Sequence, residues 1–435
     1  MAAAIEVIEG VDSAGGQPGS RGMKIAIISS LFTPFGIGGA EQVAAQIAEG
    51  LQQEGHEVDV ISTVRRRDLH GDDYRIDSLN GMRVWRIAPW NLYWRFDRET
   101  DHPGRLTRAA WHAVDLWNPT VARPLAKVLE KIKPDVVNTH NIDGLSPLVW
   151  QVARRSSTVV HTLHDFHLIC PRATMQRRDG APCPALCRGC SIYASYHQFY
   201  QRYVNAMISP TQMAADLHRS AGWTTPKMVV VRNAVGVGEE ALPISSLTGS
   251  LHVVFMSRLV REKGCETLIQ AMATFRGRKD HIQFHIAGEG PYAERFAQLA
   301  AEESHITWHG YVKGQQKSTL LSRADIFLQL SECRENAPLS VLEAKQFGNY
   351  VIATRIGGLP ELIMEPFDGQ LIRPADPLSL VDAIETQITN RARIRELRVT
   401  RGIASRGYGI HEMSRQYSQV FASVNSHCPL TEALR

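Results

Sequence analysis

Two successive series of short apolar runs, each alternating with segments of helical periodicity, extend along almost the whole chain and constrain its fold more than any other feature. In the first series the apolar runs lie at residues 24–29, 58–62, 84–88, 135–139, 158–162, 206–209 and 228–231. In the second series they lie at residues 252–257, 283–287, 325–330 and 350–354. Strands that alternate with helices form mainly parallel, doubly wound sheets. The sequence therefore predicts an α/β protein with two Rossmann-like domains.

The length of the chain also favours two domains. It has 435 residues, and a single hydrophobic core rarely grows beyond about 250–300 residues. Residues 244–250 are small and polar, so we expect them to link an N-terminal domain of residues 23–243 to a C-terminal domain of residues 251–395. Residues 1–22 have no basic start followed by an apolar core, so they are predicted to be a disordered tail and not a secretory signal.

Composition excludes some classes of protein and leaves others open. A net charge of +4 with 21% charged residues is too mildly basic to indicate nucleic-acid binding, whereas it fits anionic small ligands or a lipid surface. Because about eighteen consecutive apolar residues are needed to span a bilayer and none occur here, no transmembrane helix is expected. We expect a cytoplasmic protein, and a peripheral position on the inner face of the membrane stays open.

Two cations and two carboxylates stand out in the second series. Arg258 and Lys263 follow the apolar run at 252–257, and Glu335 and Glu343 lie eight residues apart around a predicted helix start. A forked guanidinium and a flexible ammonium suit the oxygens of a diphosphate, and carboxylates accept hydrogen bonds from sugar and ribose hydroxyls. Singly, each of these residues is more often a solvated surface charge. Together they predict a nucleotide diphosphate site.

The helix between the two glutamates adds an anion site. Pro338 suits the first helical position because it has no N–H to lose there. The amides of Leu339 and Ser340 would then point out of the helix start, where a phosphate is stabilised.

The first series contributes a glycine loop and two histidines. Gly38 and Gly39 join the first strand to its helix, where bare backbone can approach a phosphate or sugar, although a simple tight turn is the alternative. His140 and His164 each follow an apolar run, at the strand ends where ligands collect in open α/β sheets. Either histidine could instead be a packing residue, and Asp165 could simply fix the tautomer of His164.

These motifs, together with Gly288 in the turn Gly288-Glu289-Gly290-Pro291 and the stretch at 357–361, resemble the retaining glycosyltransferases of family 4, the glycosyl transferases group 1, which have the GT-B fold. The resemblance runs from Met23 to about Val424 and is most specific at residues 335–343. It implies two domains facing a central cleft and a C-terminal helix, residues 396–425, that crosses back to the first domain.

The resemblance also implies roles for individual residues. It assigns catalytic functions to His140, Arg258, Lys263 and Glu335. It assigns donor contacts to Gly38, Gly39, His164, Gly288, Asn336, Ala337, Leu339, Ser340 and Glu343, with Glu343 at the ribose. No cofactor or metal is required for catalysis, because side-chain cations and the helix dipole stabilise the leaving diphosphate. One departure is Asn349-Tyr350, where the family has a small residue and a proline.

The implied reaction is the transfer of a sugar from a nucleotide diphosphate donor to a hydroxyl of a sugar, lipid-linked or glycan acceptor, with retention at the anomeric carbon. Such transfer would serve the synthesis of a polysaccharide, glycolipid or glycoconjugate. Two alternatives are a GT-B nucleotide-sugar epimerase and a catalytically silent protein that binds sugar nucleotides or senses metals. The intact charged set favours the transferase.

Two further clusters are unusual. Five tryptophans alternate with arginines between residues 83 and 124: Trp85, Trp90, Trp94, Trp111 and Trp117. They are predicted either to bind sugar rings or a membrane surface, or to belong to the core.

Four cysteines lie in a turn-rich insertion, residues 166–192, with little apolar content: Cys170, Cys183, Cys187 and Cys190. A structural zinc, or less favourably an iron-sulfur cluster, would order this insertion. Reduced cysteines or a facultative disulfide are the alternative.

Overall fold

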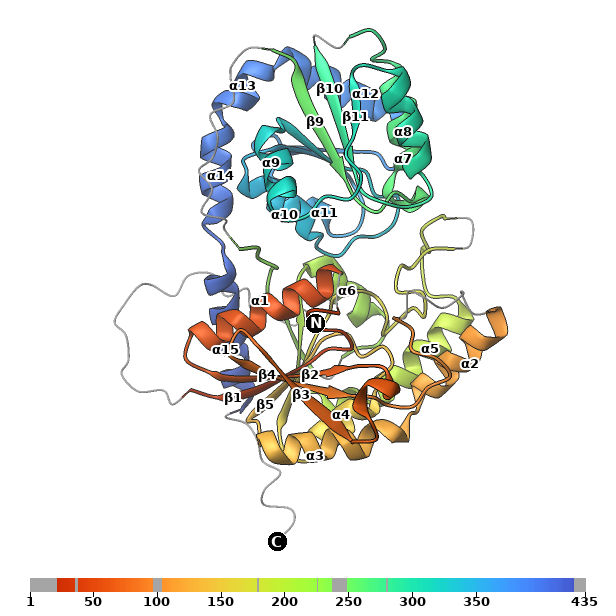
Figure 1. The fold of residues 1–435 in the computed structure, drawn as a ribbon, viewed down its shortest axis with the longest axis vertical. Coiled ribbons are helices and arrows are strands. Elements are labelled where there is room, and N and C mark those ends of the chain that lie inside the picture. Colours follow the sequence, from red (N-terminus) through yellow and green to blue (C-terminus); the bar gives the residue numbers. More distant parts are fainter. Residues whose placement is uncertain are drawn as a thin grey trace, which may run out of the picture.

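The computed structural model of the chain describes residues 22–35, 38–96, 104–177, 180–224, 226–236, 249–278 and 281–425. Residues 1–21 of the predicted tail and most of the predicted linker lie outside these residues. Two α/β domains are stacked along the long axis of the molecule, one above the other (Figure 1). The predicted α/β architecture of two Rossmann-like domains is confirmed.

The N-terminal domain contains an eight-stranded sheet with the order β3-β4-β2-β1-β5-β6-β7-β8, parallel except for the antiparallel pair β3 and β4. Its strands are β1 (Lys24–Ile28), β2 (Glu57–Thr63), β3 (Tyr74–Leu79), β4 (Met82–Ile87), β5 (Val136–Thr139), β6 (Thr158–Thr162), β7 (Ala206–Ser209) and β8 (Lys227–Val230). The central strands are buried on both faces, which explains why they are nearly continuous apolar runs in the sequence.

Helices cover both faces of this sheet (Figure 1). They are α1 (Gly39–Gln53), α2 (Arg105–Leu116), α3 (Ala122–Ile132), α4 (Leu148–Ala153), α5 (Arg188–Phe199) and α6 (Gln212–Ser220), with short 3-10 turns at Arg66–Leu69, Pro119–Val121 and Gln201–Tyr203.

The C-terminal domain contains a six-stranded, wholly parallel sheet with the order β11-β10-β9-β12-β13-β14. Its strands are β9 (Leu251–Met256), β10 (Ile282–Ala287), β11 (Ile306–Trp308), β12 (Ile326–Gln329), β13 (Tyr350–Thr354) and β14 (Gly369–Ile372). Its helices are α7 (Cys265–Ala273), α8 (Ala293–Glu302), α9 (Gln315–Arg323), α10 (Leu339–Gln346), α11 (Leu359–Leu362), α12 (Pro377–Thr389), α13 (Arg391–Glu396) and α14 (Arg398–Arg406), with a 3-10 turn at Arg261–Lys263.

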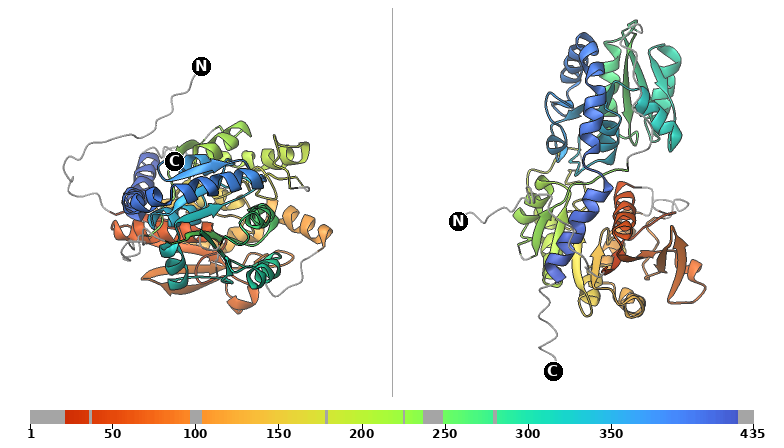
Figure 2. Two further views of the ribbon diagram at one scale, coloured as in Figure 1. Left: turned by 90° about the horizontal axis from the view of Figure 1, so that it is seen from above. Right: turned by 90° about the vertical axis from the view of Figure 1, so that its left-hand side faces the viewer.

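The last helix, α15 (Ile410–Asn425), leaves the second domain and packs beside α1 of the first (Figures 1 and 2). Met413, Tyr417 and Phe421 belong to the same buried cluster as the apolar residues of α1. A Cβ atom at Gly50 would lie 1.9 Å from the Ser414 hydroxyl, so glycine at this position permits the close approach of the two helices. The two domains are therefore joined by a second chain crossing.

The Cys-rich insertion differs from its prediction. Its first part is packed into the hydrophobic core through Phe166, Ile169 and Cys170, so burial does organise it. Its last part is helical, because Cys187 precedes α5 and Cys190 lies in the first turn of that helix.

Candidate active site

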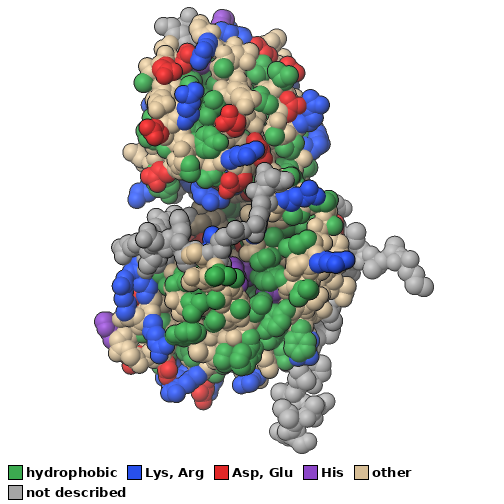
Figure 3. Space-filling view, turned by 90° about the vertical axis from the view of Figure 1, so that its right-hand side faces the viewer, with side chains coloured by type: hydrophobic (Ala, Val, Ile, Leu, Met, Phe, Trp, Pro, Cys, Tyr) green, Lys and Arg blue, Asp and Glu red, His purple; other side chains and the backbone are tan. Residues whose placement is uncertain are grey.

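A hollow lies between the two domains (Figure 3), and residues that follow the carboxyl ends of strands in the two sheets are in contact. Thr211, after β7, donates its hydroxyl hydrogen to the Asn336 amide oxygen, after β12, at 2.7 Å. The Leu339 side chain at the start of α10 belongs to a buried cluster of the first domain, and lies 4.0 Å from the position of a Cβ at Gly39. The glycine loop of the first domain therefore lies against the helix start of the second.

In the second domain, one carboxylate oxygen of Glu335 collects three donors. The Lys263 ammonium forms an ion pair with it, the Ser331 hydroxyl donates at 2.5 Å, and the Gln329 amide donates at 3.4 Å. Ser331 and Gln329 stand at the carboxyl end of β12, which fixes the position of the carboxylate. The structure thus joins Lys263 and Glu335, which the sequence analysis placed at separate parts of one donor site.

Arg258 follows β9 and its guanidinium is exposed at the domain surface. The loop that carries it is held by Gly288 and Gly290, whose φ angles are 139° and 145°. A Cβ at Gly288 would lie 1.9 Å from the Ser257 carbonyl oxygen, so only glycine allows the turn after β10 to approach the turn after β9.

The helix start of α10 differs slightly from its prediction. Pro338 is the residue before the helix, with φ −66° and ψ 124°, and Leu339 is the first helical residue. Glu343, in the second turn of α10, forms an ion pair with the Lys317 ammonium at 2.6 Å. Lys317 lies on α9 and carried no motif in the sequence, so its position beside Glu343 was not predicted.

In the first domain, His140 and His164 form a pair. His140 Nδ1 lies 2.7 Å from His164 Nε2, and the two rings are stacked with centroids 5.0 Å apart. Burial lowers the pKa of His140 well below its ordinary value and lowers the pKa of His164 to about 4, so both rings are neutral at pH 7. Asp165 does not orient His164, because its carboxylate accepts the backbone N–H of His167 instead, at 2.7 Å.

The second nitrogen of His140, Nε2, is buried and has no hydrogen-bond partner within the described part of the chain. His140 lines a small cavity with residues 141–143, 161–165, 167 and 168. An imidazole nitrogen without a partner is able to form a hydrogen bond with a hydroxyl group.

The tryptophans divide between the core and the surface of the first domain. Trp85 and Trp111 belong to the core, with 4% and 2% exposure, whereas Trp90 and Trp117 are 45% and 59% exposed. Trp90, Trp94 and Trp111 line a cavity of about 100 Å³ beside Arg66 and Arg95. This cavity lies on the first domain.

None of the four cysteines of the insertion forms a disulfide within the described part of the chain. The thiol of Cys190 interacts with those of Cys187 and Cys170, and burial together with these neighbours raises its pKa to about 12. Cys183 is instead held through its backbone, because its carbonyl oxygen accepts a hydrogen bond from Arg334 of the second domain at 2.7 Å. The predicted zinc or iron-sulfur site at the four cysteines stays a prediction.

Comparison with known proteins agrees with this architecture. Residues 243–405 match the family model of glycosyl transferases group 1, and residues 38–234 match the glycosyl transferase 4-like domain. The chain is 26% identical over 344 residues to an uncharacterized 42.6 kDa protein in the cps region of Klebsiella pneumoniae, with 78% of this chain and 87% of that protein covered.

Solved structures share the fold. The sucrose-phosphate synthase of Thermosynechococcus elongatus has a TM-score of 0.69 at 18% identity, with 93% of this chain and 99% of that chain covered. The Anabaena protein HepE, in complex with UDP, has a TM-score of 0.65 at 16% identity, with 92% and 100% covered.

Two Rossmann-like domains with their strand ends facing one cleft define the GT-B class of proteins. The family matches of both domains then indicate the activity of this chain, which is a GT-B glycosyltransferase. Its N-terminal domain is a glycosyl transferase 4-like domain, and its C-terminal domain belongs to the glycosyl transferases group 1.

Proposed function

We propose that the protein transfers a sugar from a nucleotide diphosphate donor to a hydroxyl acceptor, with retention of configuration at the anomeric carbon. The observation that carries the proposal is the ion pair between Lys263 and Glu335 beside the start of α10. Asn336, the residue after Glu335, contacts the first domain through its hydrogen bond with Thr211. The complex of the Anabaena protein with UDP supports a nucleotide donor.

In the proposed reaction the bond between the anomeric carbon and the diphosphate oxygen breaks, and the acceptor oxygen attacks from the same face. The acceptor proton passes to an oxygen of the departing diphosphate. Lys263, Arg258 and the amides of Leu339 and Ser340 stabilise the negative charge that develops there, an electrostatic contribution of several kcal/mol. Because Glu335 is already bonded to Lys263 and Ser331, it is suited to hold sugar hydroxyls and not to act as a nucleophile.

The neutral histidine pair completes the donor site. His140 lines the cavity, and we assign its unpartnered Nε2 to a hydroxyl of the donor sugar near the reacting carbon. A neutral imidazole serves this purpose better than a cation, because it does not oppose the positive charge that develops on the sugar.

The side-chain cations and the helix start replace a metal ion at the diphosphate in this proposal. The affinity for the nucleoside diphosphate should therefore be the same with and without Mg²⁺. A Kd that decreases more than about tenfold on addition of Mg²⁺ would contradict it.

We also propose that the acceptor is presented at a membrane surface, as part of polysaccharide or glycolipid synthesis. Hydrophobic side chains gather on the face of the first domain that includes α2 and α5 (Figure 3). Leu106, Trp117, Ile192 and Phe199 are 56–87% exposed there, and exposed Arg202 lies 3.8 Å over the ring of Phe199. None of the described helices is long and apolar enough to cross a bilayer. The test is co-sedimentation of the protein with anionic vesicles. If the Ile192→Asp variant sediments with the vesicles as the wild type does, a peripheral position is contradicted.

A ligand screen followed by product analysis tests the transfer reaction. Nucleotide sugars with different bases and sugars are compared by thermal shift, because a ligand stabilises the folded state by RT ln(1 + [L]/Kd). The donor so found is incubated with candidate acceptors, and the anomeric configuration of the product is read by NMR. Binding without transfer or hydrolysis would favour a silent binding protein, and inversion would overturn the proposed mechanism.

A further inference from the structure

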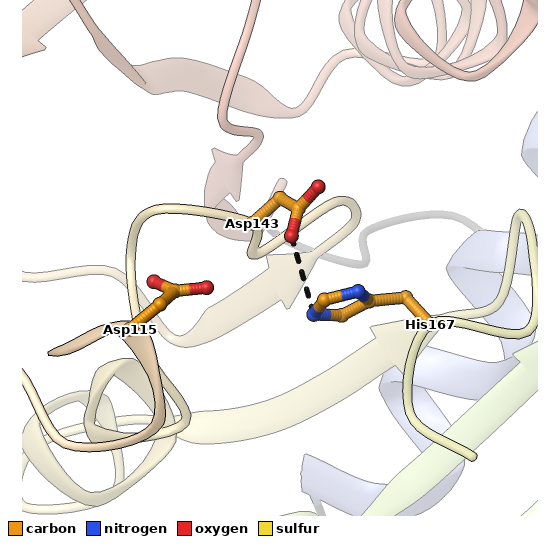
Figure 4. Close-up of side chains that lie close together, drawn as sticks. All are labelled: Asp115, Asp143 and His167. Carbon is orange, nitrogen blue, oxygen red and sulfur yellow. Dashed lines mark ion pairs between the residues drawn. The ribbon is translucent and has the colours of Figure 1, made fainter. Parts of the chain in front are cut away.

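Three potential metal ligands converge outside the donor site. One ligand atom each from Asp115, Asp143 and His167 lies within 4.8 Å of the other two. Figure 4 shows the two carboxylates and the imidazole pointing toward one another from separate segments. Asp115 stands near the end of α2, Asp143 follows β5 and His167 follows β6.

Neighbouring groups fix each of the three side chains. The amides of Gly144 and Ser146 hydrogen bond to the Asp115 carboxylate, and Arg95 pairs with one oxygen of Asp143. The other oxygen of Asp143 lies 3.3 Å from His167 Nε2. The three ligands are therefore held in place before any cation arrives, which lowers the entropy lost on binding.

One oxygen in this cluster lacks the partner that a buried charge needs. Asp115 is 6% exposed, and its Oδ1 atom is buried without a hydrogen-bond partner among the residues that the structure describes. Burying a charge without a counter-charge is strongly unfavourable. A cation between the carboxylates would remove this conflict.

We propose that Asp115, Asp143 and His167 bind one divalent cation of the Mn²⁺ or Zn²⁺ type. Carboxylates suit Mn²⁺ and imidazole suits Zn²⁺, and both ions accept this mixed set of ligands. Three protein ligands leave further coordination positions for water or for a hydroxyl of the acceptor. The inference does not depend on the transfer reaction.

The site would tie α2 to the turns after β5 and β6. His167 and Asp143 line the same cavity as His140 and His164, and Arg95 connects the cluster to the tryptophan-lined cavity. A cation here would fix the acceptor side of the first domain and would take no part at the donor diphosphate. It would also be separate from the four cysteines of the insertion.

Direct cation binding tests the proposal on the full-length protein, freed of metal by a chelator and then dialysed. Isothermal titration with MnCl₂, and electron paramagnetic resonance of the remaining free Mn²⁺, should give one equivalent bound, with a rise in Tm on binding. Asp115→Asn and His167→Gln should each weaken binding at least tenfold. Asp216→Asn, which changes an exposed aspartate on α6, should leave it unchanged.

Two further measurements distinguish this site from metal binding at the cysteines or elsewhere on the chain. Zn²⁺ is titrated into a variant with serine at positions 170, 183, 187 and 190, where one equivalent should still bind. Anomalous scattering from wild-type crystals soaked in MnCl₂ locates the ion without any variant. No stoichiometric binding, binding that survives both ligand substitutions, or density elsewhere would overturn the proposal and leave a carboxylate pair that shares a proton.

Discussion

At the scale of single residues, the two cations of the proposed diphosphate clamp are held differently. Lys263 is fixed by its ion pair with Glu335, whereas Arg258 is exposed. We expect Lys263→Ala and Arg258→Ala each to lower kcat/KM more than tenfold, a loss of about 1.4 kcal/mol or more of transition-state stabilisation. Arg261→Ala removes an exposed cation from the same turn and is the matched control. Steady-state kinetics check this, and retention of more than a tenth of the activity would remove that cation from the clamp.

Glu343 should behave differently because a ribose contact is equal in the ground state and the transition state. Glu343→Ala is expected to raise the donor KM about tenfold while kcat changes little. Lys317→Met, which removes the ion-pair partner of Glu343, should raise the KM by a smaller factor. A large loss of kcat at unchanged KM in the Glu343 variant would refute the ribose assignment.

The histidine pair predicts a pH dependence of stability. The pKa of His164 in the folded state is lowered to about 4, and an ordinary histidine has a pKa of about 6.5. The contribution of His164 to the stability of the folded state is therefore complete above about pH 6.5. It is lost as the pH falls toward 4, because the unfolded chain binds the proton first. When the pH falls from 7 to 5, the free energy of unfolding of His164→Gln should therefore decrease by about 2 kcal/mol less than that of the wild type.

Urea denaturation at the two pH values measures this difference. His411→Gln, which changes an exposed histidine, should leave the pH dependence as in the wild type. An equal pH dependence in the His164 variant and the wild type would show that His164 takes up its proton in the folded state near its ordinary pKa.

At the scale of elements, two glycines of the proposed site differ in what they tolerate. Gly288→Ala should destabilise the protein by about 2 kcal/mol or more, because φ is 139° and the added Cβ would collide with the Ser257 carbonyl. Gly39→Ala should leave stability nearly unchanged, since its Cβ would lie 4.0 Å from the Leu339 side chain. Thermal and urea denaturation compare them, and equal stabilities of the two variants would contradict the tight approach at Gly288.

The sequence predicted most strands of both sheets and missed β3, β11 and β14. The central strands are apolar on both faces, so their runs were readable within one or two residues. β3 was missed because its residues alternate between half-buried and exposed at the sheet edge, and β11 because it has only three residues. Pro338 was predicted one position too far into the helix, since a proline suits both the helix cap and the first turn.

The candidate sites also divide into residues that the sequence predicted and residues that it missed. Lys263, Glu335 and His140 follow strands, where the topology itself predicts a shared cleft. The cluster around Asp115 was not predicted, because Asp115 lies on a helix and meets Asp143 and His167 only through the packing of α2. A sequence pattern carries no signal for such a contact beyond polar residues after two adjacent strands.

At the scale of the whole molecule, the cleft depends on how the two domains are held together. The carboxylate of Glu361, in the second domain, accepts the backbone N–H groups of Gln212 and Met213, both at 2.7 Å. These amides begin α6 of the first domain, so a residue of one domain caps a helix of the other. Thr211 at the same helix start donates a hydrogen bond to Asn336, which is next to Glu335 of the proposed donor site. The contact therefore joins the two domains beside the proposed donor site.

Glu361→Ala should weaken this contact by about 1 kcal/mol, because two amides at a helix start lose a charged acceptor. Each domain keeps its own core, so Tm should change little, while hydrogen exchange at Gln212 and Met213 should become several-fold faster. The radius of gyration from solution scattering should increase as the open arrangement becomes more populated. Glu294→Ala, which removes an exposed glutamate from α8, should change neither quantity. Unaltered exchange at α6 in the Glu361 variant would mean that the capping contact does not hold the domains closed in solution.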